Sequence, residues 1–440
     1  MKRLRVFLAI TAISVLGFNT SAHAVPSFAR QTGLACAACH TNYPELTQFG
    51  RVFKLNGYTL TGIKQIQAEP TTGAVGLKIN EIPPLSAMLQ ISATAMKKQD
   101  PASQNGSVGF PQAASLFFAG EIAEHLGTFM QVTYTQDAGK FNWDNTDVRY
   151  ANQAGGTVWG VTLNNNPTVQ DVWNSTPAWG FPFSASAAAN TPAAATLIDG
   201  TLAQDVGGIG AYALFANHYY AELTLYRSAH QGPDTATTPV GQAAPTPASK
   251  NTIKGLAPYW RLAWQNNFGP NYLMVGAYGL VTSLYPTGFT GDTDKFNDSA
   301  LDAQYERMFG SDSLTLRGTY IHEKKDLDAT FPVGASNPSD TLNTLKLNGT
   351  YHFGGKYSLS LAHFQTTGSA DAVLYNLSAN ASPDSRGQIV QAIYLPWQNV
   401  QITAQYTMYS KFNGAKSDYN GAGRNASDND TFYLLFWLMW

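Results

Sequence analysis

Two cysteines and a histidine form a pentapeptide whose residue types and spacing specify a chemistry. Cys36, Cys39 and His40 lie in the sequence Cys-Ala-Ala-Cys-His. Two thiols at this spacing can add across the two vinyl groups of one haem, and the adjacent imidazole is then carried under the ring, where it ligates the iron. The pentapeptide therefore predicts one covalently bound haem c on Cys36 and Cys39, with His40 as an axial ligand.

Two other uses of the cysteine pair are disfavoured by its surroundings. A zinc site would need two further Cys or His side chains nearby, and the sequence has none between Thr41 and Leu85. A thioredoxin-like redox pair would need a βαβ context, which the sequence does not provide. The chain of 440 residues has 2 cysteines, so no structural disulfide competes for them.

The N-terminus has the pattern of a secretory signal peptide. Lys2, Arg3 and Arg5 supply the positive region, an apolar region follows, and Ala22-His23-Ala24 is a small-x-small cleavage site. We therefore expect residues 1–24 to be removed. Export fits the expected cofactor, because haem c is attached outside the cytoplasm.

The composition limits the classes of partner and fold. Charged residues make up 13% of the chain, against about 25% in typical soluble domains. The net charge of −2 gives no reason to expect nucleic acid as a partner. Beyond the leader, the sequence has no apolar run that approaches the ~18 residues of a membrane-spanning helix. If the chain lies in a membrane, it does so as a β-barrel.

Residues 25–84 have the features of a small haem-binding module. A helix is expected over residues 41–58, with an apolar stripe toward the ring. A module of about sixty residues is too small to build a large core unaided, so the haem or a neighbouring domain must supply apolar surface. The stripe consists of Leu46, Phe49 and Phe53. Three basic residues are either partners of the haem propionates or solvated surface charges: Arg30, Arg51 and Lys54.

The rest of the chain has the pattern of a β-barrel. From Leu85 to Trp440 there are about sixteen segments in which apolar and polar residues alternate with the period of two that is typical of strands. Turn residues bound these segments. The expected strands are 85–97, 113–122, 128–136, 145–152, 156–164, 206–216, 218–227, 257–266, 271–282, 298–309, 313–322, 341–353, 356–366, 386–395, 399–410 and 430–440.

The connections between the segments alternate between short turns and long polar loops. Short turns such as Glu124–Gly127 follow one end of the strands, and loops such as 165–205 and 228–256 follow the other. This alternation is typical of an outer-membrane barrel whose short turns face the periplasm. An even number of strands brings both ends of the barrel to the periplasmic side, so the haem module joined at Leu85 enters from there.

One face of each segment suits lipid and the other suits a polar lumen. Val400 and Ile402, for example, alternate with Gln401 and Thr403. The last segment, residues 431–440, is too short to span as a helix, and in a soluble protein it would leave an exposed apolar edge. We therefore expect a transmembrane antiparallel barrel, surrounded by lipid, in the outer membrane of a Gram-negative-type bacterium.

A longer motif surrounds the pentapeptide. It begins with Phe28-Ala29-Arg30-Gln31-Thr32-Gly33, and after Cys-Ala-Ala-Cys-His it continues as Pro44-x-Leu46 and Phe49-Gly50-Arg51-x-Phe53-Lys54-x-x-Gly57-Tyr58. Over these residues the chain resembles the fused outer-membrane cytochrome-porins that are associated with iron(II) oxidation. The barrel resembles that family in size and architecture alone.

The resemblance implies a function as an iron(II):cytochrome c oxidoreductase. In that family one haem occupies the N-terminal module, and electrons from extracellular ferrous iron pass inward to a periplasmic electron carrier. The haem-attachment roles carry over to Cys36, Cys39 and His40, whereas no iron-binding site carries over. Because a bilayer core is ~30 Å thick, a haem inside the barrel mouth comes closer to an outside donor than one on the periplasmic surface.

The module does not supply a second axial ligand for the iron. Apart from His40, residues 25–84 contain no His and no Met. In their segments, Met88 and His352 fall on the same alternate positions as the polar residues, which are expected to face the lumen, and both lie near the periplasmic mouth. Met96 also faces the lumen but lies near the outer end. The alternation therefore predicts that Met88 or His352 ligates the iron, unless both merely fill the lumen and the iron is five-coordinate.

Two further features leave alternatives open. The acidic run at residues 292–302 offers hard carboxylates that suit ferrous iron, although a solvated loop has the same composition. The stretch 164–182, with which the long connection 165–205 starts, either folds inward to constrict the lumen or covers the outer rim. Three functions remain: an iron(II) conduit, a haem conduit for another extracellular donor or acceptor, and a diffusion porin with a structural or sensory haem. The acidic run consists of Asp292, Asp294, Asp298 and Asp302. Four charged residues expected in the lumen would suit a solute channel as well: Glu121, Arg149, Arg261 and Arg317.

Overall fold

The computed structural model of the protein describes most of the chain beyond the leader. The expected signal peptide, residues 1–24, lies outside the described residues. The described ranges are 26–60, 67–68, 79–80, 83–100, 104–135, 139–229, 252–286, 288–334 and 337–440.

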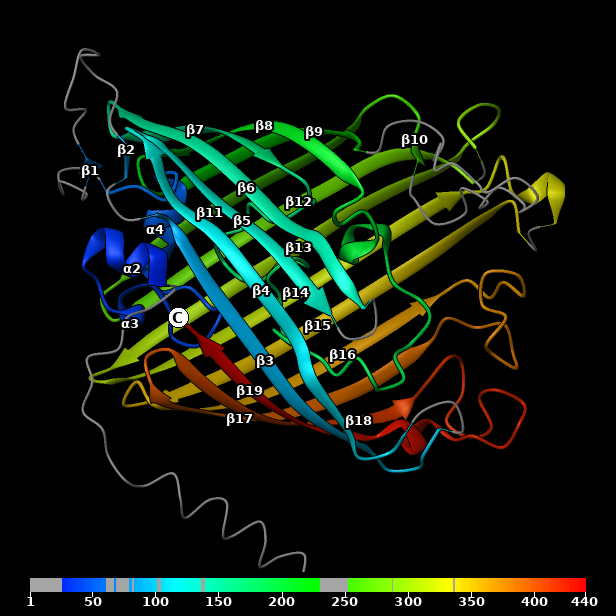
Figure 1. The fold of residues 1–440 in the computed structure, drawn as a ribbon. Helices are drawn as coiled ribbons and strands as arrows, with labels where there is room; N and C mark the ends of the chain where they lie inside the picture. Colours follow the sequence, from blue (N-terminus) through cyan, green and yellow to red (C-terminus); the bar gives the residue numbers. More distant parts are fainter. Residues whose placement is uncertain are drawn as a thin grey trace, which may run out of the picture.

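An antiparallel sheet that closes on itself dominates the fold (Figure 1). The sheet contains 17 strands, and setting aside the two-residue strand β10 (Thr252–Ile253) leaves sixteen long ones. These are β3 (Leu85–Met96), β4 (Ser107–Ala123), β5 (Leu126–Thr135), β6 (Lys140–Ala154), β7 (Thr157–Asn164), β8 (Val206–Phe215), β9 (Tyr219–Ser228), β11 (Ala257–Phe268), β12 (Asn271–Tyr285), β13 (Asp294–Phe309), β14 (Asp312–Asp326), β15 (Ser339–Phe353), β16 (Tyr357–Gly368), β17 (Ser385–Trp397), β18 (Val400–Lys411) and β19 (Thr431–Met439). The last strand, β19, pairs with the first, β3, and β9 pairs with β11, so the sixteen strands form a closed barrel.

Each of the sixteen predicted segments corresponds to one of these strands, and the predicted fold class is confirmed. The largest difference is at β4, which begins at Ser107 rather than at residue 113. The strand continues past Pro111 through a register shift opposite Gln90 and Ser92 of β3. The predicted segment starts after Pro111, and within a sheet proline is confined to strand starts, edges or bulges, because it has no backbone N–H to donate to the ladder.

The strands alternate between buried, mostly polar residues that face the lumen and apolar residues that face outward. In β3 the side chains of Ser86, Gln90 and Ser92 are buried, whereas Leu262 of β11 and Leu301 of β13 are more than half exposed. Hydrocarbon accommodates such an apolar belt, and a closed sheet needs no water at a strand edge. The protein is therefore an outer-membrane β-barrel. Exposed aromatic residues ring the rim with the short turns: Phe309, Phe353, Tyr357, Tyr394 and Trp397.

Both ends of the barrel lie at the mouth that carries the short turns. Trp440 exchanges two backbone hydrogen bonds with Ala87, of 2.9 and 3.0 Å. Figure 1 shows the C-terminus beside the blue helices of the N-terminal module, with the long loops at the opposite end. The module therefore enters the barrel from the mouth predicted from the sequence.

The described part of the module contains three short helices, which are α2 (Pro26–Thr32), α3 (Cys36–Cys39) and α4 (Gln48–Leu55). Two further segments, β1 (Gln67–Ala68) and β2 (Ile79–Asn80), pair with each other. No helix among the described residues is both long and apolar enough to cross a membrane.

The helix expected over residues 41–58 is shorter than predicted. It begins at Gln48, where the Thr47 side chain accepts a hydrogen bond from the Gly50 N–H and caps the helix. Pro44 lies within the stretch that stays non-helical, and proline is poorly tolerated inside a helix. The helix stops before Gly57, whose φ of +68° lies in the left-handed region that glycine adopts without strain.

The sequence motif around α4 packs closely against the helix that carries the two cysteines. A Cβ atom added at Gly50 would lie 2.3 Å from the backbone oxygen of Cys39, so a side chain at this position would push the helices apart. The Thr47 hydroxyl also donates a hydrogen bond of 2.6 Å to the Ala38 oxygen. The absence of a side chain at Gly50, the glycine of the Phe-Gly-Arg motif, therefore allows α4 to pack directly against the attachment site.

Charged residues of the module pair with charged residues of the barrel wall. Arg317 of β14 donates a hydrogen bond of 2.8 Å to Glu45, and Nε2 of His352 in β15 lies 3.3 Å from the same carboxylate oxygen. Arg51 of α4 donates two hydrogen bonds, of 2.5 and 3.1 Å, to Glu306 of β13. These contacts fix the module to three consecutive strands.

A second anchor lies across the barrel. The Tyr58 hydroxyl donates a hydrogen bond of 2.6 Å to Asp147 of β6. Arg149 of the same strand donates to that carboxylate oxygen at 2.8 Å, and both side chains of the ion pair are fully buried. In the ladder order, β6 is nearly half the circumference away from β14, so the module is held at two opposed points of the wall.

Replacing Glu45 by alanine is expected to loosen the module, because the guanidinium of Arg317 loses the carboxylate that compensates its burial. Removing one partner of a buried ion pair costs about 3–5 kcal/mol. We expect faster hydrogen exchange over residues 26–60, while the barrel keeps its heat-modifiable mobility in gel electrophoresis. Phe49→Ala is the matched control, since Phe49 is 40% exposed and surface substitutions change stability by about 0.5 kcal/mol or less. Equal exchange in the two variants would contradict the anchoring role.

Candidate functional site

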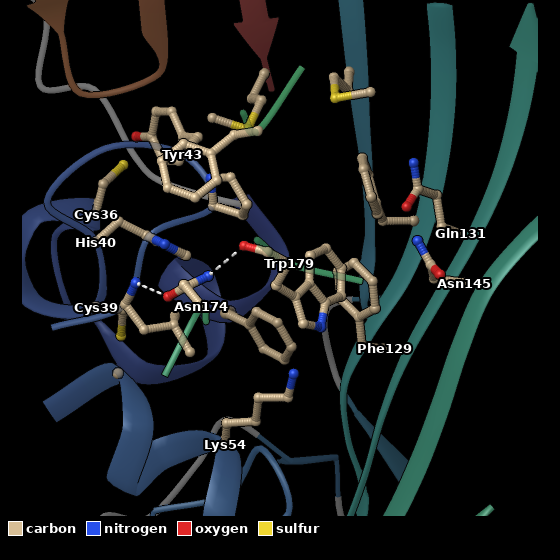
Figure 2. A pocket seen from close by; sticks show the side chains of 18 of the residues that line it. Cys36, Cys39, His40, Tyr43, Lys54, Phe129, Gln131, Asn145, Asn174 and Trp179 are labelled. Atoms are coloured by element: carbon tan, nitrogen blue, oxygen red, sulfur yellow. Dashed lines mark hydrogen bonds between the residues drawn. The ribbon is translucent and has the colours of Figure 1, made fainter. Parts of the chain in front are cut away.

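The module and the barrel wall enclose a cavity of about 410 Å³, a volume in the range of cofactor sites. Cys36, Cys39 and His40 all line it. Figure 2 shows these three side chains on one side of the cavity, with Trp179 and Phe129 on the other. The three residues that the sequence singled out for haem attachment are thus brought together at one apolar cavity. Its apolar lining includes Phe28, Leu46, Phe53, Met88, Phe117, Trp437 and Met439.

The short helix α3 positions the two thiols. It is a single turn, so Cys36 and Cys39 lie on neighbouring positions of one helical face. The backbone N–H of His40 donates to the Cys36 oxygen at 2.9 Å, and His40 itself has an extended backbone that leaves the helix. An isolated bridge pairs His40 with Leu46. The imidazole is therefore carried just beyond the turn that holds the thiols.

The protonation state of the imidazole suits a metal ligand. Burial lowers the pKa of His40 to about 4, so the ring is neutral at neutral pH and one ring nitrogen keeps a free lone pair. Its Nδ1 atom is buried without a hydrogen-bond partner among the described residues. Cys36 and Cys39 are free thiols, and burial raises the pKa of Cys39 to about 11. Two free thiols, a neutral imidazole and apolar walls are the groups that a covalently bound haem requires, so the residues present fit it.

One of the three basic residues that were considered either as partners of the haem propionates or as surface charges lines the cavity. Lys54 lies at its edge, where Nζ donates hydrogen bonds of 2.6 and 2.9 Å to the backbone oxygens of Val169 and Asp171. Burial, aided by the nearby Arg149, lowers the pKa of Lys54 to about 7. Arg51 is instead paired with Glu306 as described above.

The third basic residue of that set, Arg30, does not line the cavity. Its guanidinium donates to the backbone oxygen of Leu85, where the module joins the barrel. Phe49 of the expected apolar stripe is also absent from the lining and is exposed, whereas Leu46 and Phe53 line the cavity. The stripe was predicted on one continuous helix, but Leu46 precedes the start of α4, and the helical spacing does not apply across that point.

The structure separates the two predicted candidates for the second axial ligand. Met88 lines the cavity and is buried on the lumenal face of β3. His352 is also lumenal, but it lies outside the cavity lining and is engaged with Glu45 and, at 2.9 Å, with Ser358. Sequence reasoning missed Met439, which lines the cavity beside Met88. The register of β19 against β3 was the missing information, since it pairs these two residues.

Three of the four aspartates of the acidic run accept internal hydrogen bonds. Asp294 accepts hydrogen bonds from the backbone of Ala329 and Thr330, and Asp298 accepts one of 2.7 Å from the Ile198 N–H. Asp292 is exposed. Within the described ranges no group of three or more His, Cys, Asp or Glu side chains could hold a metal ion. The four aspartates therefore do not form such a group in the part of the chain that the structure describes.

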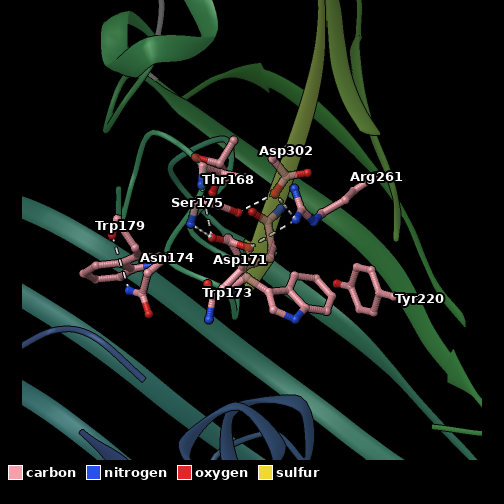
Figure 3. A network of polar contacts seen from close by, with 12 residues as sticks. Thr168, Asp171, Trp173, Asn174, Ser175, Trp179, Tyr220, Arg261 and Asp302 are labelled. Atoms are coloured by element: carbon pink, nitrogen blue, oxygen red, sulfur yellow. Dashed lines mark hydrogen bonds and ion pairs between the residues drawn. The ribbon is translucent and has the colours of Figure 1, made fainter. Parts of the chain in front are cut away.

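The long connection 165–205 folds inward and fills the lumen. Figure 3 shows its residues Asp171 and Ser175 against the wall residues Arg261 and Asp302. Arg261 donates a hydrogen bond of 2.6 Å to Asp302 and lies 3.7 Å from Asp171. Ser175 donates to the same Asp302 oxygen. The two interpretations left open by the sequence are thus decided in favour of constriction.

Apolar side chains of the same connection pack against aromatic residues of the wall. Trp173 is fully buried, stacks edge-on against Tyr220 at 5.3 Å and donates a hydrogen bond of 2.6 Å to Tyr272. Further outward, Ile198 and Leu202 are buried in a cluster with wall residues of β9, β11 and β12. The described part of the lumen is therefore packed like a protein core rather than left as a wide aqueous channel.

Comparison with known proteins gives matches to solved structures alone. Neither a protein-family model nor a curated protein sequence matches the chain. A loop-L8 deletion mutant of OmpT from Vibrio cholerae is similar at a TM-score of 0.46 and 13% identity, over 81% of this chain and 98% of that chain. An anion-selective porin from Comamonas acidovorans has the same four values. OmpF of Salmonella typhi, in complex with daunomycin, is similar at 0.48 and 11%, over 81% and 97%. The barrel assignment rests on the strand pairing described above.

Replacing Trp173 by alanine is expected to open the lumen. The substitution removes a fully buried aromatic side chain, at a cost of about 3–5 kcal/mol, and leaves space where the inward connection meets the wall. Single-channel conductance in planar bilayers should rise above that of the wild-type protein. Trp397→Ala, on the exposed rim, is the control and should leave conductance unchanged. Equal conductance in both variants would contradict the role of the connection as the seal of the lumen.

Proposed function

We propose that the protein is an outer-membrane electron conduit. Cys36 and Cys39 would hold one haem c covalently and His40 would ligate its iron, and the protein would pass electrons from extracellular ferrous iron to a periplasmic electron carrier. The observation that carries this proposal is the convergence of two free thiols and a neutral imidazole on one apolar cavity inside the barrel mouth. The choice of ferrous iron as donor rests on the resemblance of the N-terminal motif.

The chain's own groups hold the site and line it with apolar side chains. Glu45 and Arg51 of the module are tied to the wall by ion pairs, so the cavity keeps its shape. Aromatic walls such as Trp179 and Phe129 lower the local polarity around the attachment turn. When bound, haem c supplies a one-electron couple: each ferrous ion oxidised to ferric ion gives up one electron, which is passed to an oxidised carrier in the periplasm.

The packed lumen favours a conduit over a diffusion porin. Arg149, Arg261 and Arg317, which would suit a solute channel, are each buried in contacts with the module or the inward connection. They are therefore not presented to a passing solute. A filled barrel keeps iron ions outside, as oxidation of an external metal requires. A haem conduit for a different extracellular donor would use the same site. The two functions are distinguished by which donor reduces the haem.

Covalent haem and its reduction by ferrous iron test the proposal directly. We expect the purified wild-type protein to carry one haem that resists acid–acetone extraction, and added ferrous iron to reduce it. The variant with Cys36→Ser and Cys39→Ser should lose all covalent haem while its barrel remains heat-modifiable. Thr41→Ser, next to the attachment turn, is the control and should keep the haem. A wild-type protein without covalent haem would contradict the proposal, and a haem that ferrous iron cannot reduce would exclude iron as the donor.

A further inference from the structure

Two methionines face each other across the strands that close the barrel. Met88 is the fourth residue of β3, and Met439 is the last residue of β19. The two are directly opposite each other in the ladder, and each is 5% exposed. Both line the cavity that also contains His40. Directly opposite residues have Cβ atoms about 5 Å apart, so either flexible thioether can reach the same region of the cavity.

Other cavity-lining groups that could ligate iron are already engaged. The Tyr58 hydroxyl donates to Asp147. The Tyr43 hydroxyl donates to the backbone oxygen of Gln398. Lys54 donates to two backbone oxygens. The two thioether sulphurs, in contrast, have no hydrogen-bond partner among the described residues.

The remaining histidines of the described ranges do not reach the cavity. His125 and His218 lie at periplasmic turns, and His322 and His363 point outward on their strands. His352 is held between Glu45 and Ser358, outside the lining. Common ligands of haem iron in proteins are the side chains of His, Cys, Met and Tyr. Because the tyrosines and the other histidines are engaged or lie outside the cavity, the methionine pair remains as the candidate ligand.

We propose that the Met88–Met439 pair supplies a thioether ligand to the haem iron, in addition to the imidazole of His40. This inference rests on the proposed covalent haem. A thioether is a soft, neutral ligand, and His/Met ligation raises the reduction potential of a haem. A raised potential is what a haem needs in order to accept electrons from ferrous iron.

The assignment makes the iron a link between two parts of the protein. His40 belongs to the module, whereas both methionines belong to the barrel wall. The same pair packs in one apolar cluster with Cys36 and Tyr43 of the module. Ligation would therefore add a coordinate bond to the ion pairs that hold the module in the mouth.

The test compares four variants of the full-length haem protein: Met88→Leu, Met439→Leu, the double variant, and Met96→Leu as control. Leucine conserves most of the volume of methionine. Met96 lies on the same lumenal face of β3 and is also 5% exposed, but it does not line the cavity. Three readouts are measured: covalent haem content, the far-red charge-transfer band of thioether-ligated ferric haem, and the midpoint potential.

We expect the wild-type protein and Met96→Leu to show the far-red band. Either one of the single variants, or the double variant if each sulphur can replace the other, should lose the band and have a lower midpoint potential, with unchanged haem content. The inference is overturned if haem-loaded wild-type protein lacks the band, or if the double variant keeps it. A spectrum altered by His352→Gln but not by the double variant would place the ligand at His352 and would also overturn it. Absence of covalent haem from the wild-type protein would instead contradict the proposed function itself.

Discussion

Arginine side chains buried in the lumen impose the constraint on which the rest of the structure depends. A guanidinium removed from water is tolerated only where carboxylates and carbonyl oxygens meet it. Arg317 meets Glu45 of the module, and Arg261 lies close to Asp171 of the inward connection. Arg149 donates to the backbone oxygen of Gln170 and also to the carboxylate of Asp147 on the same strand, β6. Each of these three wall arginines therefore finds a carboxylate or carbonyl oxygen that the module or the connection supplies.

This complementarity explains why the cavity exists. The module alone is too small to enclose a cofactor, and a porin-like wall alone would leave a wide lumen. Helix α2 contacts β3 and β4, and Cys36 of α3 packs in one cluster with Met88 and Met439. The inward connection adds Trp179 as a further wall. Figure 2 shows how side chains from these distant segments converge. The apolar cavity thus lies between parts of the chain that ion pairs such as Glu45–Arg317 and Arg51–Glu306 hold together.

The sequence predicted the features that depend on local pattern. Sixteen alternating segments were placed correctly because the period of two is a property of each strand by itself. The attachment residues were found because Cys36, Cys39 and His40 are contiguous. The inward path of residues 165–205 was not predictable, since it depends on partners such as Asp302 that lie more than a hundred residues away. Met439 was missed for the same reason, because its place in the cavity follows from the register of the closing strands.

The seam between β19 and β3 has a consequence for biogenesis. These are the last and first long strands, and the hydrogen bonds between them close the barrel. If the thioethers on that seam complete the iron's coordination sphere, a porphyrin-bearing precursor waiting in the periplasm keeps one axial position vacant. Maturation of the metal centre would then coincide with the final sealing of the cylinder, and half-assembled intermediates would differ in colour and potential from the finished protein.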